Sequence, residues 1–200
     1  MPGQDYQIRM KLKVLFLILT LNMSLITSAE SFGLVVHGGA GVLSGLSIER
    51  QQEIENKVKE TLISAYKILE DGGSSMDAVE FAVSEFEDST LFNAGKGSVY
   101  NSDEVQEMDA SIMNGADRSA GAVASVQIIK NPIKLARKVL EETDHVLLVG
   151  RGAEIFAKDI EETIVDRSYF HSEKNLKRLK KAKKRISDNS IIEDKIGTVG

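Results

Sequence analysis

The sequence contains no cysteine and only three histidines, and both shortages limit the chemistry that it can perform. Without cysteine there is no disulfide, no thiolate nucleophile and no thiolate metal site. His37, His145 and His171 form no His-x-x-x-His pair, so a catalytic zinc site is not favoured. The net charge of −5 gives no overall attraction to nucleic acid or to an acidic membrane surface. What is present, 42% hydrophobic and 28% charged residues over 200 positions, is typical of one soluble globular domain.

The first 29 residues have the layout of a secretory signal peptide. Three basic residues stand ahead of an apolar run, namely Arg9, Lys11 and Lys13. The run, Val14 to Ile26, is short for a transmembrane helix, and small residues follow it at 27–29. A buried core helix is the alternative. We expect residues 1–29 to be removed, Met10 to be a second candidate start, and the mature protein to be periplasmic or secreted without a membrane anchor.

Two helices are predicted after a short first strand. The apolar segment Phe32–His37 predicts a buried strand that ends in a glycine-rich turn. After Ser47, apolar residues recur every three or four positions, as on one face of a long helix: Ile54, Val58, Leu62, Ala65 and Leu69. Gly72-Gly73 ends this pattern, and Ser74 with Asp77 three residues later predicts the capped start of a second helix.

The middle of the chain predicts strands that alternate with helices. Residues 107–112 and 121–129 have the composition of neighbouring strands, and Asn131-Pro132 predicts the start of a helix with asparagine at the N-cap. Residues 146–149 form an apolar strand, and a helix is expected over 153–158. This order of elements indicates an α/β or layered α+β domain.

A basic segment follows. Residues 174–185 contain eight lysines and arginines in twelve positions, which predicts a solvated helix within a flexible linker over 166–197. The alternative is an anion-binding module that contacts phosphates. The segment has no aromatic residue for stacking on bases, so binding to nucleic acid is not favoured.

Two glycine clusters are candidates for ligand-binding turns. Gly38, Gly39 and Gly41 follow the first predicted strand, where glycine permits a tight turn or a close backbone approach. Their spacing fits neither the phosphate-binding loop nor the dinucleotide-binding motif. Gly150-x-Gly152 lacks the third glycine of that motif and is interpreted as a turn.

The loop Asn93-Ala94-Gly95-Lys96-Gly97 places an amide beside two glycines. Such an amide can orient an amine or a hydroxyl without adding charge, and an Asx-type turn is the structural alternative. The carbonyl oxygens of a tight loop also suit a monovalent cation. Asp109, in a strand of small residues, is expected to pair with a backbone turn or a lysine. His37 and His145 are expected to be hydrogen-bonded core residues.

The last four residues, Gly197-Thr198-Val199-Gly200, suggest an N-terminal nucleophile. If the Gly197–Thr198 bond is cut, the freed amine of Thr198 can act as the base for its own hydroxyl. Taken alone, the same four residues describe an ordinary start of a strand.

Four motifs in order resemble the plant-type L-asparaginase/isoaspartyl peptidase family of N-terminal-nucleophile hydrolases. They are His37-Gly38-Gly39-Ala40-Gly41, Leu91 to Gly97, Met108 to Gly115, and Gly197 to Gly200. The resemblance covers about residues 33–200. It implies an αββα four-layer sandwich that is incomplete here, since the C-terminal half and its substrate-binding residues would lie beyond Gly200.

The resemblance also implies roles for particular residues. Thr198 would be the nucleophile, freed by self-cleavage after Gly197, and Asn93 would position its amine. Gly38, Gly39 and Gly41 would lie near the scissile bond. Main-chain oxygens would hold a structural sodium ion, the only cofactor implied: those of Phe86, Glu87, Ser89, Phe92, Ala94 and Lys96.

On this interpretation, residues 30–165 belong to an α subunit, 166–197 to the linker and 198–200 to the start of a β subunit. The implied substrates are the side-chain amide of L-asparagine or β-aspartyl dipeptides. The implied partners are the β subunit and a second αβ pair, in an (αβ)2 dimer, with no nucleic acid and no membrane. A glycosylasparaginase and an inactive truncated fragment are the alternatives.

Overall fold

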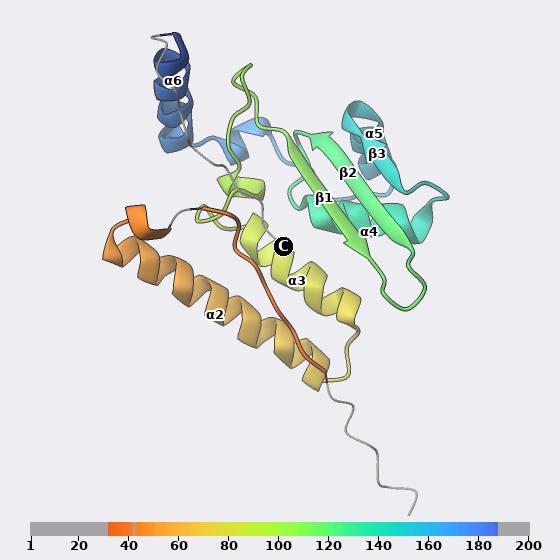
Figure 1. Ribbon diagram of the computed structural model, residues 1–200. Coiled ribbons are helices and arrows are strands. Elements are labelled where there is room, and N and C mark those ends of the chain that lie inside the picture. Colours follow the sequence, from red (N-terminus) through yellow and green to blue (C-terminus); the bar gives the residue numbers. More distant parts are fainter. Residues whose placement is uncertain (1–31, 42, 188–200) are drawn as a thin grey trace, which may run out of the picture. The chain divides into compact units, whose positions relative to one another are not determined.

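The computed structural model describes residues 32–41 and 43–187 (Figure 1). The chain divides into two compact units, Met1–Gly33 and Leu34–Gly200, and every helix and strand of the described residues lies in the second. The predicted signal peptide and the predicted Gly197–Thr198 cleavage site fall outside the described residues.

Helices α2 (Ile48–Glu70) and α3 (Ser75–Glu87) confirm the two predicted helices, and the one-turn helix η1 (Leu43–Gly45) precedes them. Ser47 caps α2, and Ser74 and Asp77 form the predicted capping box of α3. The tight connection between the helices uses Gly72, whose φ of +85° favours glycine. The two helices pack on each other, and α3 lies between α2 and the sheet (Figure 1).

The sheet has three strands in the order β1 (Met108–Met113), β2 (Ala120–Val126) and β3 (Leu147–Val149). β1 and β2 are antiparallel, whereas β2 and β3 are parallel and are connected through helix α4 (Pro132–Glu142). Helix α5 (Gly150–Asp159) follows β3 directly. The mixed sheet with covering helices confirms the α/β class and is consistent with part of an N-terminal-nucleophile hydrolase fold.

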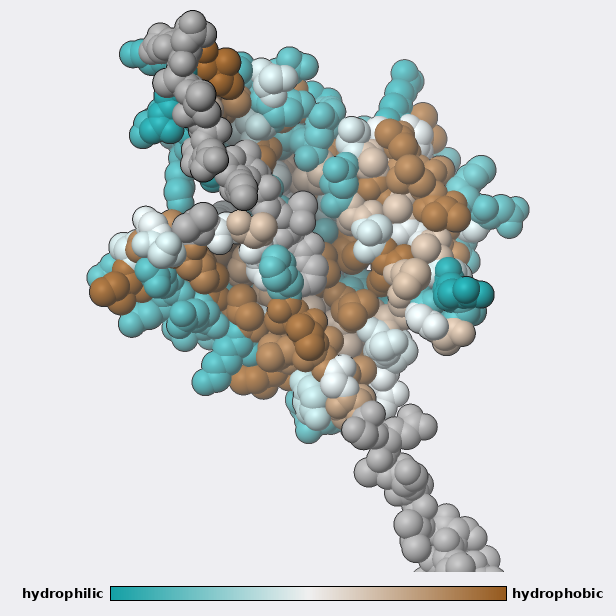
Figure 2. All heavy atoms as spheres, viewed as in Figure 1, coloured by the Kyte–Doolittle hydropathy of each residue, from teal (hydrophilic) through white to brown (hydrophobic). Residues whose placement is uncertain are grey.

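The core lies between α4 and one face of the sheet. Gly121 of β2 permits this close packing, because a Cβ atom there would lie 2.2 Å from the carbonyl oxygen of Ala136. The buried side chains alternate with exposed or partly buried ones along β1, and with partly buried ones along β2, as a sheet covered on one face requires. The opposite face leaves Met113, Leu147 and Val149 exposed, and Figure 2 shows apolar residues gathered over the sheet.

Helices α3 and α4 are joined by an ion-pair cluster. The Arg137 guanidinium contacts Asp77 at 2.7 Å, Glu80 at 3.0 Å and Glu141 at 2.6 Å. Hydrogen bonds from Ser74, then from Arg137, lower the pKa of Asp77 to about 2. This cluster fixes the start of α3 against α4 on the solvent side of the core.

The predicted strand over Phe32–His37 is wrong. The described residues before Gly39 have no regular secondary structure, and Val35 is 92% exposed. A β-strand needs a neighbouring edge for its backbone hydrogen bonds, and among the described residues none of β1 to β3 pairs with this segment.

The predicted linker boundary at residue 166 falls inside a packed part of the chain. The one-turn helix η3 (Arg167–Phe170) buries Phe170, which is 1% exposed, against the core formed by the sheet and α4. Helix α6 (Glu173–Ser187) confirms that the basic residues form a helix. Two aromatic residues, Tyr169 and Phe170, attach this segment to the core. The basic composition of the residues that follow them gave no indication of this contact.

Candidate functional site

The loop that carries Asn93 connects α3 to β1 and contains the one-turn helix η2 (Gly95–Gly97). The Asn93 Oδ1 atom accepts a hydrogen bond from the Val99 N–H at 2.9 Å, which closes the loop on itself. Because the Val99 N–H is a donor, it must bond to the oxygen of the Asn93 side-chain amide. The NH2 group of that amide therefore points away from Val99. The Asx-type role and the orienting role predicted for Asn93 therefore use different edges of one side chain.

Two glycines let main-chain carbonyls converge in this loop. A Cβ atom on Gly97 would lie 2.0 Å from the Phe92 oxygen and 2.9 Å from the Ser89 oxygen. A Cβ atom on Gly95, whose φ is +47°, would lie 2.3 Å from the Glu87 oxygen. Only glycine fits either position, and the space that a side chain would fill is bordered by carbonyl oxygens.

This arrangement fits the predicted sodium ligands in part. Three of the six predicted oxygens, those of Glu87, Ser89 and Phe92, face the two glycines. The Ala94 oxygen instead accepts the Gly97 N–H at 2.9 Å. Neutral oxygen donors suit a hard monovalent cation, and among the described residues no three His, Asp or Glu side chains gather into a metal-binding group. The Lys96 ammonium lies 5.2 Å from the centre of the Tyr169 ring, in a cation–π contact with η3.

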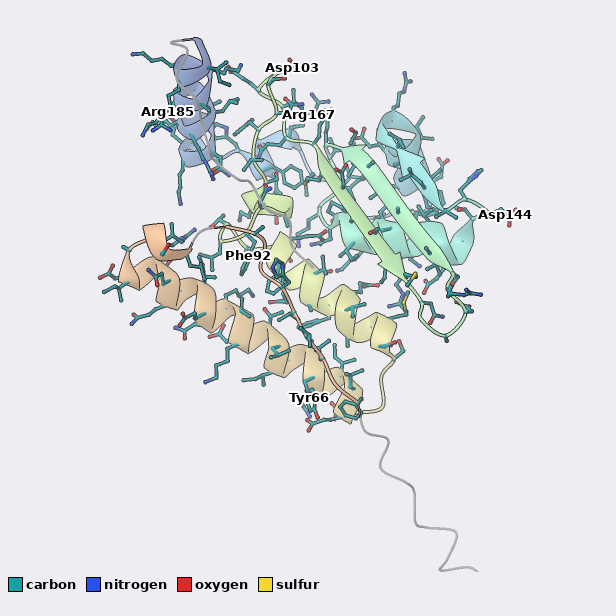
Figure 3. All side chains as sticks on the ribbon, in the orientation of Figure 1. Tyr66, Phe92, Asp103, Asp144, Arg167 and Arg185 are labelled. Atoms are coloured by element: carbon teal, nitrogen blue, oxygen red, sulfur yellow. The ribbon has the colours of Figure 1, made fainter. Side chains whose placement is uncertain are left out.

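The glycine-rich turn after His37 lies beside this loop. A Cβ atom on Gly38 would be 3.0 Å from the ring of Phe92, the neighbour of Asn93, and Figure 3 shows Phe92 next to that segment. Gly39 has a φ of +101° and donates its N–H to His37 Nδ1 at 3.2 Å, whereas Gly41 has no close neighbour. The structure thus brings Gly38 to the Asn93 loop, while Gly197 and Thr198 lie outside the described residues.

A cavity of about 660 Å³ opens between the Asn93 loop, the sheet and the start of α4. Its walls include Asn93, Gly95, Glu87, Asp109 and Ser111. It has the size of a site for a small molecule, and polar side chains and apolar ones both line it.

Asp109 has the structural role that was predicted for it. Its carboxylate accepts the Ser125 N–H at 2.8 Å, at a register shift between β1 and β2 where Ser125 has a φ of +54°. His37 and His145, predicted to be core residues, are both exposed. Both rings reach solvent, so neither needs a buried hydrogen-bond partner.

The Glu87 side chain is a buried acid that the sequence did not reveal. It is 3% exposed, its Oε1 accepts the Ile133 N–H at 3.0 Å, and its Oε2 has no partner among the described residues. Burial raises the pKa of Glu87 to about 8, against the lowering effects of the Ile133 N–H and of the Asn131 side chain. Glu87 therefore caps α4, whereas Asn131 occupies the predicted N-cap position but donates its amide to Asp88 at 3.2 Å.

The raised pKa of Glu87 predicts a fall in stability as the pH rises. Between pH 4.5 and about 8, the folded chain keeps a proton on Glu87 that the unfolded chain has released. The free energy of unfolding therefore decreases across this range. Glu87→Gln, a neutral isostere, should remove this dependence and stabilise the chain at pH 9 by several kcal/mol. Urea unfolding at pH 5, 7 and 9 in sodium-free buffer measures it, with the exposed Glu53→Gln as control. Equal pH slopes for wild type and Glu87→Gln would contradict the prediction.

Comparison with known proteins identifies the same family as the motifs. A family model described as asparaginase matches residues 30–200. The isoaspartyl peptidase/L-asparaginase of Mus musculus is 44% identical over 177 residues, which are 85% of this chain and 52% of the relative. That of Rattus norvegicus is 48% identical over 151 residues, 72% of this chain and 45% of the relative. The plant-type L-asparaginase of Pyrococcus horikoshii is 51% identical over 125 residues, 62% of this chain and 40% of the relative. The chain thus spans about half or less of the length of these relatives.

Proposed function

The chain belongs to the asparaginase family, and on that premise we propose that it supplies the N-terminal part of a hydrolase of L-asparagine and β-aspartyl dipeptides. The observation that carries the proposal is the Asn93 loop. Its two obligatory glycines, its oriented amide and the neighbouring cavity form the kind of rigid polar site that a small amide substrate needs.

Maturation is proposed to proceed by self-cleavage. The Thr198 hydroxyl oxygen attacks the Gly197 carbonyl carbon, and the peptide nitrogen leaves as the free amine of Thr198. Gly197 is then held as an ester on the threonine oxygen. Water hydrolyses this ester, which releases the Gly197 carboxylate and leaves Thr198 as a new N-terminus.

The mature residue is proposed to act on the side-chain carbonyl of the substrate. The Thr198 amine takes the proton of its own hydroxyl, and the oxygen attacks the carbonyl carbon. Ammonia leaves from asparagine, or the amine of the second residue leaves from a β-aspartyl dipeptide. Water then releases the aspartyl product from the enzyme. Asn93 positions the amine through the amide edge that faces away from Val99.

A sodium ion is proposed at the carbonyls of the loop, where its charge would offset the converging dipoles and hold the loop in shape. The Glu87, Ser89 and Phe92 oxygens would hold it, with those of Phe86, Ala94 and Lys96 as the remaining members of the set. The ion has a structural role in this proposal and takes no part in the reaction.

Export and assembly are also proposals. The N-terminal residues support removal of a signal peptide and a periplasmic or secreted location. Among residues 32–41 and 43–187, no helix has the length and apolar character needed to cross a bilayer. The exposed sheet face supports a β subunit as the partner, in an (αβ)2 dimer.

Expression of the full reading frame tests the proposal. A denaturing gel should show the chain converted into two fragments, and the second should begin at Thr198 by N-terminal sequencing. The purified protein should release ammonia from L-asparagine and free aspartate from a β-aspartyl dipeptide. A single uncleaved chain that produces neither would overturn the proposal.

A further inference from the structure

The peptide unit between Ser98 and Val99 is held by hydrogen bonds on both sides. Its N–H, on Val99, donates to Asn93 Oδ1 at 2.9 Å. Its carbonyl oxygen, on Ser98, accepts from Gln106 Nε2 at 2.7 Å and from Asn175 Nδ2 at 3.0 Å. The peptide is planar and stiff, so donors that fix the carbonyl also fix the direction of the N–H that Asn93 accepts.

The Gln106 side chain connects this peptide to the core. It is 8% exposed, and its Nε2 also donates to the Phe170 carbonyl oxygen at 2.7 Å. Phe170 is packed in the core, and Ser98 is 4% exposed. A donor held between buried groups loses little freedom when it bonds, because its position is already set by packing.

Asn175, on helix α6, restrains the same peptide unit. It lies in the first turn of this helix, and its Nδ2 donates to the Gly97 oxygen at 3.1 Å as well as to the Ser98 oxygen. Tyr100 supports the connection, since its hydroxyl accepts the Ser172 N–H at 3.3 Å. Lys183 binds Glu104 at 3.1 Å farther along the helix. In Figure 3, α6 with Arg185 and the loop with Asp103 lie at the same end of the molecule as Arg167 of η3.

We propose that Asn175 and Gln106 are positioning residues for Asn93, which act through the Ser98–Val99 peptide. The inference rests on the proposed function, because it assigns Asn93 the task of orienting the Thr198 amine. Two donors on a carbonyl polarise the peptide and strengthen the hydrogen bond that its N–H makes. The Asn93 amide is then held by its oxygen edge, and its NH2 edge keeps one direction. The basic helix α6 therefore helps to hold the Asn93 loop in place, in addition to continuing the chain toward residue 197.

Asn175→Asp in the full reading frame tests the proposal. The variant has the shape of asparagine but no N–H donors for the two carbonyls. We expect kcat for L-asparagine to fall about tenfold, the value of one hydrogen bond of ordinary net strength, with KM unchanged within about twofold. Asn175→Ala should act in the same direction. Lys181→Ala, an exposed change on the same helix, should leave both constants unchanged.

A second mutation shows whether the effect passes through Asn93. In an Asn93→Ala background, Asn175→Asp should lower kcat no further, because the side chain on which it acts is gone. If the two losses multiply, Asn175 acts elsewhere and the proposal is overturned. A kcat equal to that of Lys181→Ala overturns it as well.

Hydrogen exchange at the Val99 amide gives a readout that needs no activity. In the Thr198→Ala chain, Asn175→Asp should raise the exchange rate of this amide about tenfold, since the peptide that carries the amide is less firmly held. Unchanged exchange overturns the proposal whatever the kinetics show. A wild-type chain that neither cleaves nor hydrolyses would overturn the proposed function, and Val99 exchange would then decide the positioning role alone.

Discussion

Thr198→Ala is expected to abolish both self-cleavage and turnover in the protein made from the full reading frame. Alanine has no hydroxyl, so no oxygen can attack the Gly197 carbonyl and no ester can form. The chain would remain intact, and the amine that serves as base would never be released. Removal of a nucleophile typically costs several orders of magnitude in kcat. A denaturing gel and an ammonia assay with L-asparagine measure the two effects together.

Thr198→Ser is the matched control, because serine keeps a hydroxyl at the same position. It should cleave and turn over, more slowly than wild type, with both rates lowered together. If Thr198→Ala is still cut after Gly197, cleavage is the work of another protease. If it still hydrolyses asparagine, the nucleophile has been misassigned.

Gly97→Ala is expected to destabilise the chain by about 3–5 kcal/mol and to stop processing. Its Cβ atom would lie 2.0 Å from the Phe92 oxygen and 2.9 Å from the Ser89 oxygen. Both are backbone atoms, which cannot swing aside as a flexible side chain can, so the loop has to open. Asn93 and the carbonyls proposed to hold sodium would move with it. Thermal unfolding in Thr198→Ala protein measures the loss of stability.

Gly115→Ala provides the comparison for this substitution. A Cβ atom at Gly115 has no neighbour within 4 Å, so the change should alter stability by no more than about 0.5 kcal/mol. A Gly97→Ala chain with the melting temperature of Gly115→Ala would show that the loop can relax, and the close approach of the carbonyls would then not be required.

The helices were predictable because their signals are local. Ser47 and Ser74 stand where the apolar periodicity begins, and the structure starts α2 and α3 directly after them. β1 and β2 lie within a few residues of the predicted strands, since the small and apolar residues of 107–112 and 121–129 fit a half-buried sheet. Phe32–His37 is also rich in apolar residues, but a strand requires in addition a partner that composition does not identify.

Of the residues in the candidate site, only those that belong to sequence motifs could be predicted. Asn93 and the glycines beside it were found because an amide next to two glycines is an unusual local pattern. The roles of the Gln106, Asn175 and Glu87 side chains depend on partners far away in sequence. Asn175, for example, bonds to Ser98, which lies 77 positions earlier. Hydrogen bonds between distant amides and carbonyls have no periodicity, so no pattern in the chain indicates them.

The face of the sheet that α4 does not cover favours association of this chain with itself in solution. A net charge of −5 should keep molecules apart in solution, but that repulsion is spread over the whole surface and is screened by salt. Met113, Leu147 and Val149 concentrate apolar area on one side, where Ser111 and Asp109 interrupt it. Attraction between two such faces acts at contact and does not weaken with salt. We therefore expect association of this chain with itself in concentrated solution to persist at high salt and to stop when this face is covered.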